Sequence, residues 1–246
     1  MRANNEDNFW VNGFCRRDVS QNRLRCHGKA LSNHFAAAVC DGMGGESFGE
    51  VASLLAVECV QPHSYYELPE GARADIRTAN NRVCRYITEH GGMSSGSTLA
   101  ALYIDSGRAV CCNVGDSRVY LLREGKLTQL SKDHNSAQRL IDSGRMTPEE
   151  ARDSPAKHTL TQYLGIFEEE MALEPHFSQP VTIRNRDCFL LCSDGLTDML
   201  WDAEISGILT RRSRPEQQAA CLLEEAMECG GKDNITVIVV HVKSCL

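Results

Sequence analysis

Three apolar segments of this 246-residue chain each adjoin an aspartate. Residues 36–40 (AAAVC) run into Asp41-Gly42, residues 190–193 (LLCS) run into Asp194-Gly195, and Asp233-Asn234 precedes residues 235–240 (ITVIVV). Short apolar runs bounded by turn residues predict buried strands. A carboxylate at the end of a buried strand is costly unless it is paired or protonated. The pattern therefore indicates that something compensates three charges at strand ends.

A divalent cation is the partner that this pattern favours, because no matching cluster of Lys or Arg accompanies the three aspartates. Mg²⁺ and Mn²⁺ take oxygen ligands at about 2.0–2.2 Å and are commonly held by a few carboxylates and waters. Each motif alone has a simpler explanation: Asp41 and Asp233 could lie in plain turns, and Ser193 or Asp194 could cap a helix beginning near Leu196. All three in one chain favour a dinuclear metal hydrolase.

Length and composition exclude several other classes of protein. The chain fits one large domain, and its 42% hydrophobic and 24% charged residues are typical of a soluble globular protein. No apolar run reaches the length of a membrane span, and the N-terminal residues lack the apolar stretch of a signal peptide. A net charge of −7 argues against a nucleic-acid binder. We expect a cytoplasmic monomer without a membrane or nucleic-acid partner, whose twelve cysteines are thiols used in packing.

Hydrophobic periodicity predicts an α+β protein built from two antiparallel sheets flanked by helices. Residues 131–166 are polar and irregular, with short helices at Ser136–Ser143 and from Pro148. Longer helices are expected around 48–59, 76–87, 202–210 and 215–229, the second ending at Gly91-Gly92. Strands are expected at 7–13, 34–40, 98–104, 109–114, 117–123, 126–130, 171–177, 180–183, 187–192 and 235–242.

Two further motifs could carry phosphate chemistry. Arg2 precedes Glu6 and Asp7, and an arginine beside a carboxylate cluster can clamp a phosphate, although a solvated terminus is equally consistent with the spacing. Cys112 and Arg118 match the Cys-x5-Arg loop of cysteine-dependent phosphatases. That loop must open a helix, whereas here it runs into a predicted strand, and Asp116 would repel the phosphate. Asp116 is better interpreted as another strand-end carboxylate.

Seven motifs, taken in order, resemble the metal-dependent type 2C serine/threonine protein phosphatases, and the Met after Asp41-Gly42 resembles the bacterial branch. The motifs are RANNED (2–7), DGMGG (41–45), GSTLA (96–100), NVGDSRVYLL (113–122), KDH (132–134), LLCSDGLTDML (190–200) and KDNITVIVV (232–240). The resemblance spans nearly the entire chain. It implies a single catalytic domain, residues 1–246, with the fold of a four-layer α-β-β-α sandwich and a flap at about 131–166.

The resemblance also implies a site that holds two Mn²⁺ or Mg²⁺ ions, with a weaker third. Asp41 matches the residue that bridges two metals, the Gly42 carbonyl matches a ligand of the second, and Asp194 and Asp233 complete the first. Asp116 matches the acid that binds the third ion. Glu6 and Asp7 match acids that bind the metals directly or through waters, and Arg2 matches the arginine that binds the phosphate. Two features depart from the family: Met43 replaces a histidine of many eukaryotic relatives, and the strand that usually precedes the arginine is missing before Arg2.

The implied reaction is hydrolysis of phosphoserine and phosphothreonine by a metal-activated water, without a covalent phosphoenzyme. The substrates would be proteins phosphorylated by a serine/threonine kinase. Two alternatives stay open at this stage. One is a phosphoprotein-binding relative without turnover, and the other is a phosphatase that uses Cys112 as its nucleophile.

Overall fold

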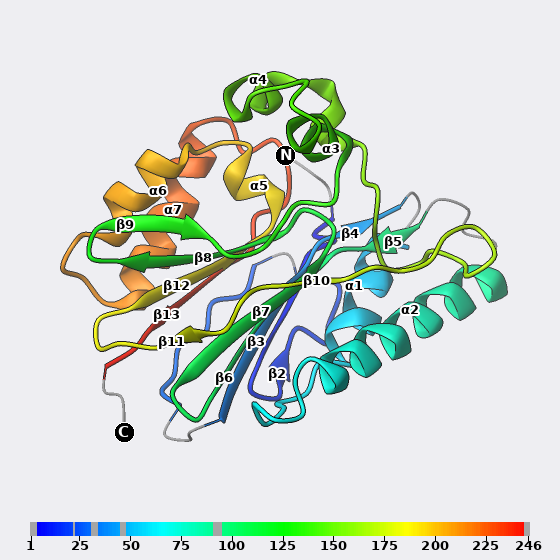
Figure 1. Cartoon of the computed structure of the whole chain (residues 1–246), viewed down its shortest axis with the longest axis horizontal. Helices are drawn as coiled ribbons and strands as arrows, with labels where there is room; N and C mark the ends of the chain where they lie inside the picture. Colours follow the sequence, from blue (N-terminus) through cyan, green and yellow to red (C-terminus); the bar gives the residue numbers. More distant parts are fainter. Residues whose placement is uncertain (1–3, 22, 31–33, 45–47, 91–94, 244–246) are drawn as a thin grey trace.

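The computed structural model describes residues 4–21, 23–30, 34–44, 48–90 and 95–243 (Figure 1). The strands form a larger sheet of seven strands and a smaller sheet of four, and neighbouring strands are antiparallel throughout. The larger sheet has the order β10 (His176–Phe177), β7 (Arg108–Val114), β6 (Leu99–Asp105), β3 (His34–Cys40), β1 (Asn8–Val11) and β2 (Phe14–Cys15), with β11 (Val181–Thr182) also on β7. The smaller sheet has the order β13 (Val237–His241), β12 (Cys188–Cys192), β8 (Arg118–Arg123) and β9 (Lys126–Gln129). A separate short pair joins β4 (Gly42–Met43) to β5 (Gly96–Ser97).

Helices cover the outer faces of both sheets (Figure 1). Helices α1 (Gly49–Val57) and α2 (Glu70–His90) pack on the larger sheet. Helices α5 (Asp194–Thr197), α6 (Asp202–Leu209) and α7 (Pro215–Glu228) pack on the smaller one. Three further short helices, α3 (Ser136–Asp142), α4 (Pro148–Asp153) and η1 (Pro155–His158), lie together above one end of the sheets. This arrangement confirms the predicted sandwich of two antiparallel sheets between helices.

The hydrophobic core is divided into three layers, one for each interface of the sandwich. Strand β3 shows how the sequence produces them, because successive side chains of a strand point to opposite faces. Ala36, Ala38 and Cys40 lie in the cluster that faces α1 and α2. Ala37 and Val39 belong to the cluster between the two sheets. A strand buried on both faces needs no polar alternation, which explains the continuous apolar run 36–40.

Most predicted elements agree with the structure, and the main differences concern short strands. The expected strands at 171–177 and 180–183 shorten to the two-residue strands β10 and β11, which pair only with the two ends of β7. Pro175 and Pro180 lie next to them and lack the main-chain donor that a longer ladder needs. The sequence predicts no strand at Phe14–Cys15, Gly42–Met43 or Gly96–Ser97, which form β2, β4 and β5. Helix α2 ends at His90, and the predicted stop at Gly91-Gly92 lies outside the described residues.

Among the described helices, none is both long and apolar enough to cross a lipid bilayer.

Candidate metal centre

The predicted carboxylates lie at one end of the two sheets because the strands that carry them end there. In the larger sheet Asn8 pairs with Cys40, so Asp7 and Asp41 extend from neighbouring strands at the same edge. The smaller sheet pairs Cys192 with both Arg118 and Val237. Asp116 and Asp233 therefore lie in the loops before β8 and β13, and Asp194 begins α5 just after β12, all at the corresponding end of the smaller sheet.

Direct contacts then join the two sheets at this end. The Ser193 hydroxyl donates to Oδ2 of Asp7 at 2.7 Å, and the same Ser193 oxygen accepts from the main-chain N–H of Thr236 at 3.0 Å. The carboxyl groups of Asp41 and Asp194 lie within hydrogen-bond reach of each other. Two carboxyl groups can share a hydrogen bond only if one carries a proton, so a cation must replace that proton when both are ionised.

Electrostatics at this cluster disfavour negative charge. Burial is the largest cause that raises the pKa of Asp41 well above its usual range, and the charges of Asp7, Asp194 and Asp116 add to it. Burial likewise raises the pKa of Asp7 to about 7, although its hydrogen bond from Ser193 acts in the opposite direction. The pKa of Asp116 and that of Asp194 are also raised, again chiefly by burial.

The donor set fits hard cations. Within the described part of the chain, Oδ1 of Asp7 and Oδ1 of Asp194 are buried without a hydrogen-bond partner. Orphaned carboxylate oxygens in a native site call for a compensating group that the protein itself does not supply. The Arg16 guanidinium does not serve this purpose, because its Nη2 donates to the main-chain carbonyl of Asp7 at 2.6 Å instead of to its carboxylate. Oxygen-only ligands of this kind suit Mg²⁺ and Mn²⁺.

Two glycines let the backbone approach this cluster closely. A Cβ on Gly42 would collide with the main-chain carbonyl of Gly49 and lie 2.6 Å from that of Glu6. A Cβ on Gly195 would collide with the carbonyl of Asn234. Glycine at these two positions is therefore required by space alone.

The N-terminal acids occupy different positions at this end of the molecule. Asp7 is 1% exposed and points toward Ser193. The Glu6 side chain lies against Gly49, the first residue of α1, where the helix dipole favours a negative charge. The main chain of Glu6 is fixed by Asn234, whose Oδ1 accepts from the Glu6 N–H at 2.8 Å. Arg2, the predicted phosphate clamp, lies outside the described residues.

Sequence reasoning missed residues that position the acids instead of adding charge. Ser193 was considered only as a helix cap, yet its side chain makes no capping bond and holds Asp7. Thr98 accepts from the Asp41 N–H at 2.9 Å and shares a hydrogen bond of 2.7 Å with Ser117. It thereby links the loop of Asp41 to the loop of Asp116. Only the tertiary structure shows these partners, although Thr98 belongs to the GSTLA motif.

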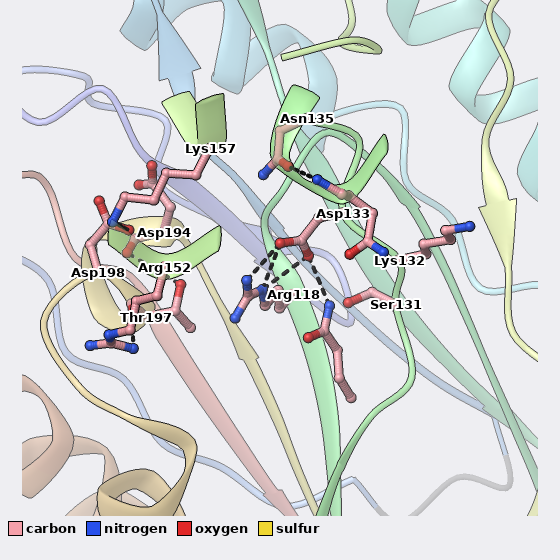
Figure 2. A network of polar contacts seen from close by, with 12 residues as sticks. Arg118, Ser131, Lys132, Asp133, Asn135, Arg152, Lys157, Asp194, Thr197 and Asp198 are labelled. Carbon is pink, nitrogen blue, oxygen red and sulfur yellow. Dashed lines mark hydrogen bonds and ion pairs between the residues drawn. The ribbon is translucent and has the colours of Figure 1, made fainter. Parts of the chain in front are cut away.

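A compensated ionic network lies directly beside the cluster (Figure 2). Arg118 donates through Nε and Nη2 to both carboxylate oxygens of Asp133, the shortest contact being 2.6 Å. Gln129 donates to the same carboxylate at 2.8 Å. This network connects β8 to residues 131–135, and the side chain of Asn135 adds a hydrogen bond toward Asp116.

A second set of potential metal ligands adjoins the cluster on the side of the short helices. Ligand atoms of His158, Asp194 and Asp198 lie within 4.8 Å of one another. Asp198 already has a cationic partner, because Nζ of Lys157 lies 3.0 Å from its Oδ1 (Figure 2). Lys157 therefore ties η1 to the end of α5 beside the carboxylates.

The Cys112 alternative disagrees with the structure. Cys112 lies within β7, fully buried in the core that faces α1 and α2. Burial raises the pKa of its thiol well above the usual range, so it is a poor source of thiolate. Arg118, the other half of the motif, is engaged by Asp133. The chain between them leads into β8 and not into a helix, as the sequence predicted.

Comparisons with known proteins agree with this geometry. The sequence model of the family described as Protein phosphatase 2C matches residues 15–229. The serine/threonine protein phosphatase PstP of Mycobacterium tuberculosis is 38% identical over 250 residues, which cover 98% of this chain and 43% of PstP. The protein phosphatase PhpP of Streptococcus pneumoniae is 33% identical over 92% of this chain and 95% of its own length. A crystal structure of the PstP catalytic domain in complex with two manganese ions superposes with a TM-score of 0.78 at 33% identity, covering 99% of this chain and 94% of that one.

The chain belongs to the protein phosphatase 2C family, which confirms the resemblance drawn from the seven motifs. Its relatives of known structure share the sandwich of two sheets flanked by helices. The chain spans less than half the length of PstP.

Proposed function

We propose that this chain is a protein-serine/threonine phosphatase that uses bound divalent cations and water to hydrolyse phosphoserine and phosphothreonine. The observation that carries the proposal is the carboxylate cluster that the two sheets bring to one edge, in which Asp7 and Asp194 each keep a buried oxygen without a partner among the described residues. Membership of the protein phosphatase 2C family and the two manganese ions of the related PstP structure support it.

The proposed ligands are the acids of the cluster. Asp41, Asp194 and Asp233, with the Gly42 carbonyl, would hold two Mn²⁺ or Mg²⁺ ions, and Asp116 would contribute to a weaker third. Asp7 and Glu6 would bind the ions directly or through waters. The assignment of Arg2 to the phosphate rests on the sequence motif alone.

The residues of the chain have defined tasks in this reaction. Bound ions supply Lewis acidity, which lowers the pKa of water and neutralises charge on phosphoryl oxygens. Ser193 and Thr98 hold Asp7 and Asp41 in place through the hydrogen bonds described above. Ser193 is occupied by those bonds, which supports hydrolysis without a covalent phosphoenzyme. Met43 cannot donate a proton to the leaving group, so a water is the proposed donor.

The surroundings of the centre suit a protein substrate. We propose one catalytic domain over residues 1–246, in which 131–166 form a flap beside the centre. The substrates would be proteins phosphorylated by a serine/threonine kinase in the cytoplasm, and the enzyme would act as a monomer.

Phosphate release from phosphoserine and phosphothreonine peptides tests the proposal. Release should require Mn²⁺ or Mg²⁺, stop with EDTA and return when Mn²⁺ is added in excess. A protein that binds Mn²⁺ and phosphopeptides but releases no phosphate would be the relative without turnover. Release that ignores EDTA would contradict the metal mechanism.

A further inference from the structure

A basic pocket lies beside the carboxylate cluster, between the short helices and the loop that precedes β13. Its volume is about 330 Å³. The charged side chains that line it are Arg152, Lys157, His158, Lys232, Asp153 and Asp198. Three permanent cations thus face two carboxylates in a protein whose net charge is −7.

This pocket adjoins the centre. A smaller pocket of about 30 Å³ is lined by Asp116 and Asp194. Lys157, His158 and Asp198 line both pockets. A ligand in the larger pocket would therefore lie next to a phosphate bound at the carboxylates.

Two of the three cations keep their charge available. Nη1 of Arg152 donates to the main-chain carbonyls of Thr197 at 3.1 Å and Leu200 at 3.2 Å, and its guanidinium stacks 3.8 Å from the Trp201 ring centroid. These contacts fix Arg152 without neutralising it (Figure 2). Over the described chain, Lys232 has no ion pair within 4.0 Å and is exposed.

The third cation is compensated. Lys157 forms its ion pair with Asp198 at the boundary between the two pockets. Asp198 would repel an anion that approached without engaging Lys157. Asp153 offsets one of the other two cations, so Arg152 and Lys232 together leave the pocket with a net positive charge.

We propose that this pocket receives a second acidic group of the peptide substrate, either a carboxylate or another phosphate, close in sequence to the phosphoresidue that is hydrolysed. Arginine and lysine bind both groups through charge-assisted hydrogen bonds. Because an extended peptide advances about 3.3–3.6 Å per residue, adjacent pockets select an acidic group within a few positions. The inference rests on the proposed phosphatase function and adds the substrate class to it.

The test compares three phosphothreonine peptides that differ only in flanking residues: one with neutral flanks, one with aspartates and one with a second phosphothreonine. Each phosphate is replaced by a non-hydrolysable phosphonate, so that fluorescence anisotropy in the presence of Mn²⁺ measures peptide binding without turnover. The wild-type protein should bind both acidic peptides more tightly than the neutral one, and added salt should reduce the preference. Lys232→Met should lower the ratio of affinities roughly two- to fivefold, as expected for one exposed charge interaction.

Lys126→Met is the matched control, because Lys126 is an exposed lysine of β9 that lines neither pocket. It should leave the ratio unchanged. If Lys232→Met loses only the preference for the aspartate peptide, the pocket is a carboxylate subsite. If it loses only the preference for the diphosphorylated peptide, the pocket is a phosphate subsite. Equal binding of all three peptides by the wild type, or an unchanged ratio in Lys232→Met, would overturn the proposal.

Hydrolysis of p-nitrophenyl phosphate with Mn²⁺ separates this inference from the proposed function. That small substrate has no flanking group, so its hydrolysis reports on the centre alone. Hydrolysis combined with equal peptide affinities overturns only the subsite. Absence of hydrolysis overturns the phosphatase, whereas a binding preference that depends on Lys232 would still establish an anion pocket.

Discussion

Two sets of carboxylates in this molecule differ in their partners. Asp133 is 6% exposed, and both of its oxygens accept hydrogen bonds from Arg118. Asp187 is 2% exposed and receives Nε and Nη2 of Arg123 in the same way. Asp7 and Asp194, in contrast, each keep one buried oxygen without a partner within the described structure.

The difference shows which acids serve the fold and which serve the reaction. A buried ion pair is stable only when its geometry satisfies both charges, and the two arginine pairs do so. An uncompensated pair of carboxylates raises its own pKa and destabilises the folded chain. Such a cluster is retained because cations complete it. Substitutions in the arginine-paired set should therefore mainly lower stability, and substitutions in the uncompensated set should mainly lower activity.

The largest effect is expected for a change in the uncompensated set. Asp194→Asn should lower kcat/KM for a phosphopeptide at least about 10³-fold, because it removes a charged ligand from the centre where transition-state charge is stabilised. Steady-state kinetics at saturating Mn²⁺ measure the loss. Activity close to that of the wild type would show that Asp194 is not part of the centre.

A change in the compensated set should affect the fold first. Asp133→Asn leaves the Arg118 guanidinium without its charged partner and should lower the free energy of unfolding by about 3 kcal/mol. Chemical denaturation measures it. Asp142→Asn is the control: its ion pair with Lys132 is exposed, 45% for the Asp142 side chain, and removing it should cost less than about 1 kcal/mol. Equal effects of the two substitutions would contradict the distinction.

A smaller, pH-dependent effect is expected at His134, which joins residues 131–135 to the loop of Asp116. Burial lowers the pKa of His134 to about 4, and its Nδ1 accepts from the Gly115 N–H at 3.3 Å. As the pH falls, His134 takes up a proton in the unfolded chain before it does so in the folded chain. The stabilisation that neutral His134 contributes is therefore complete above pH 6.5 and is lost as the pH falls toward 4. The difference in unfolding free energy between wild type and His134→Asn should shrink by about 1–2 kcal/mol over that interval. A difference that does not change with pH would contradict the assignment.

The sequence predicts the acids of the centre better than the residues that position them. Asp41, Asp194 and Asp233 follow or precede apolar runs, and antiparallel pairing brings such strand ends together. The supports depend on contacts between distant residues: Ser193 and Asp7 are 186 positions apart. No local pattern predicts that Arg118 selects Asp133 instead of a phosphate. The short strands β10 and β11 were overestimated for the same reason, because their length is limited by pairing at the ends of β7 and not by their own composition.

The most direct test of the account is the stability of the protein with and without Mn²⁺. At neutral pH, Mn²⁺ at 100 times its dissociation constant should raise the free energy of unfolding of the wild type by about 2.7 kcal/mol. Asp194→Asn should lose most of this gain and, in EDTA, should be at least as stable as the wild type, because it removes one of the repelling charges. A wild-type protein that Mn²⁺ does not stabilise, or an Asp194→Asn variant that is strongly destabilised in EDTA, would contradict the claim that cations complete this cluster.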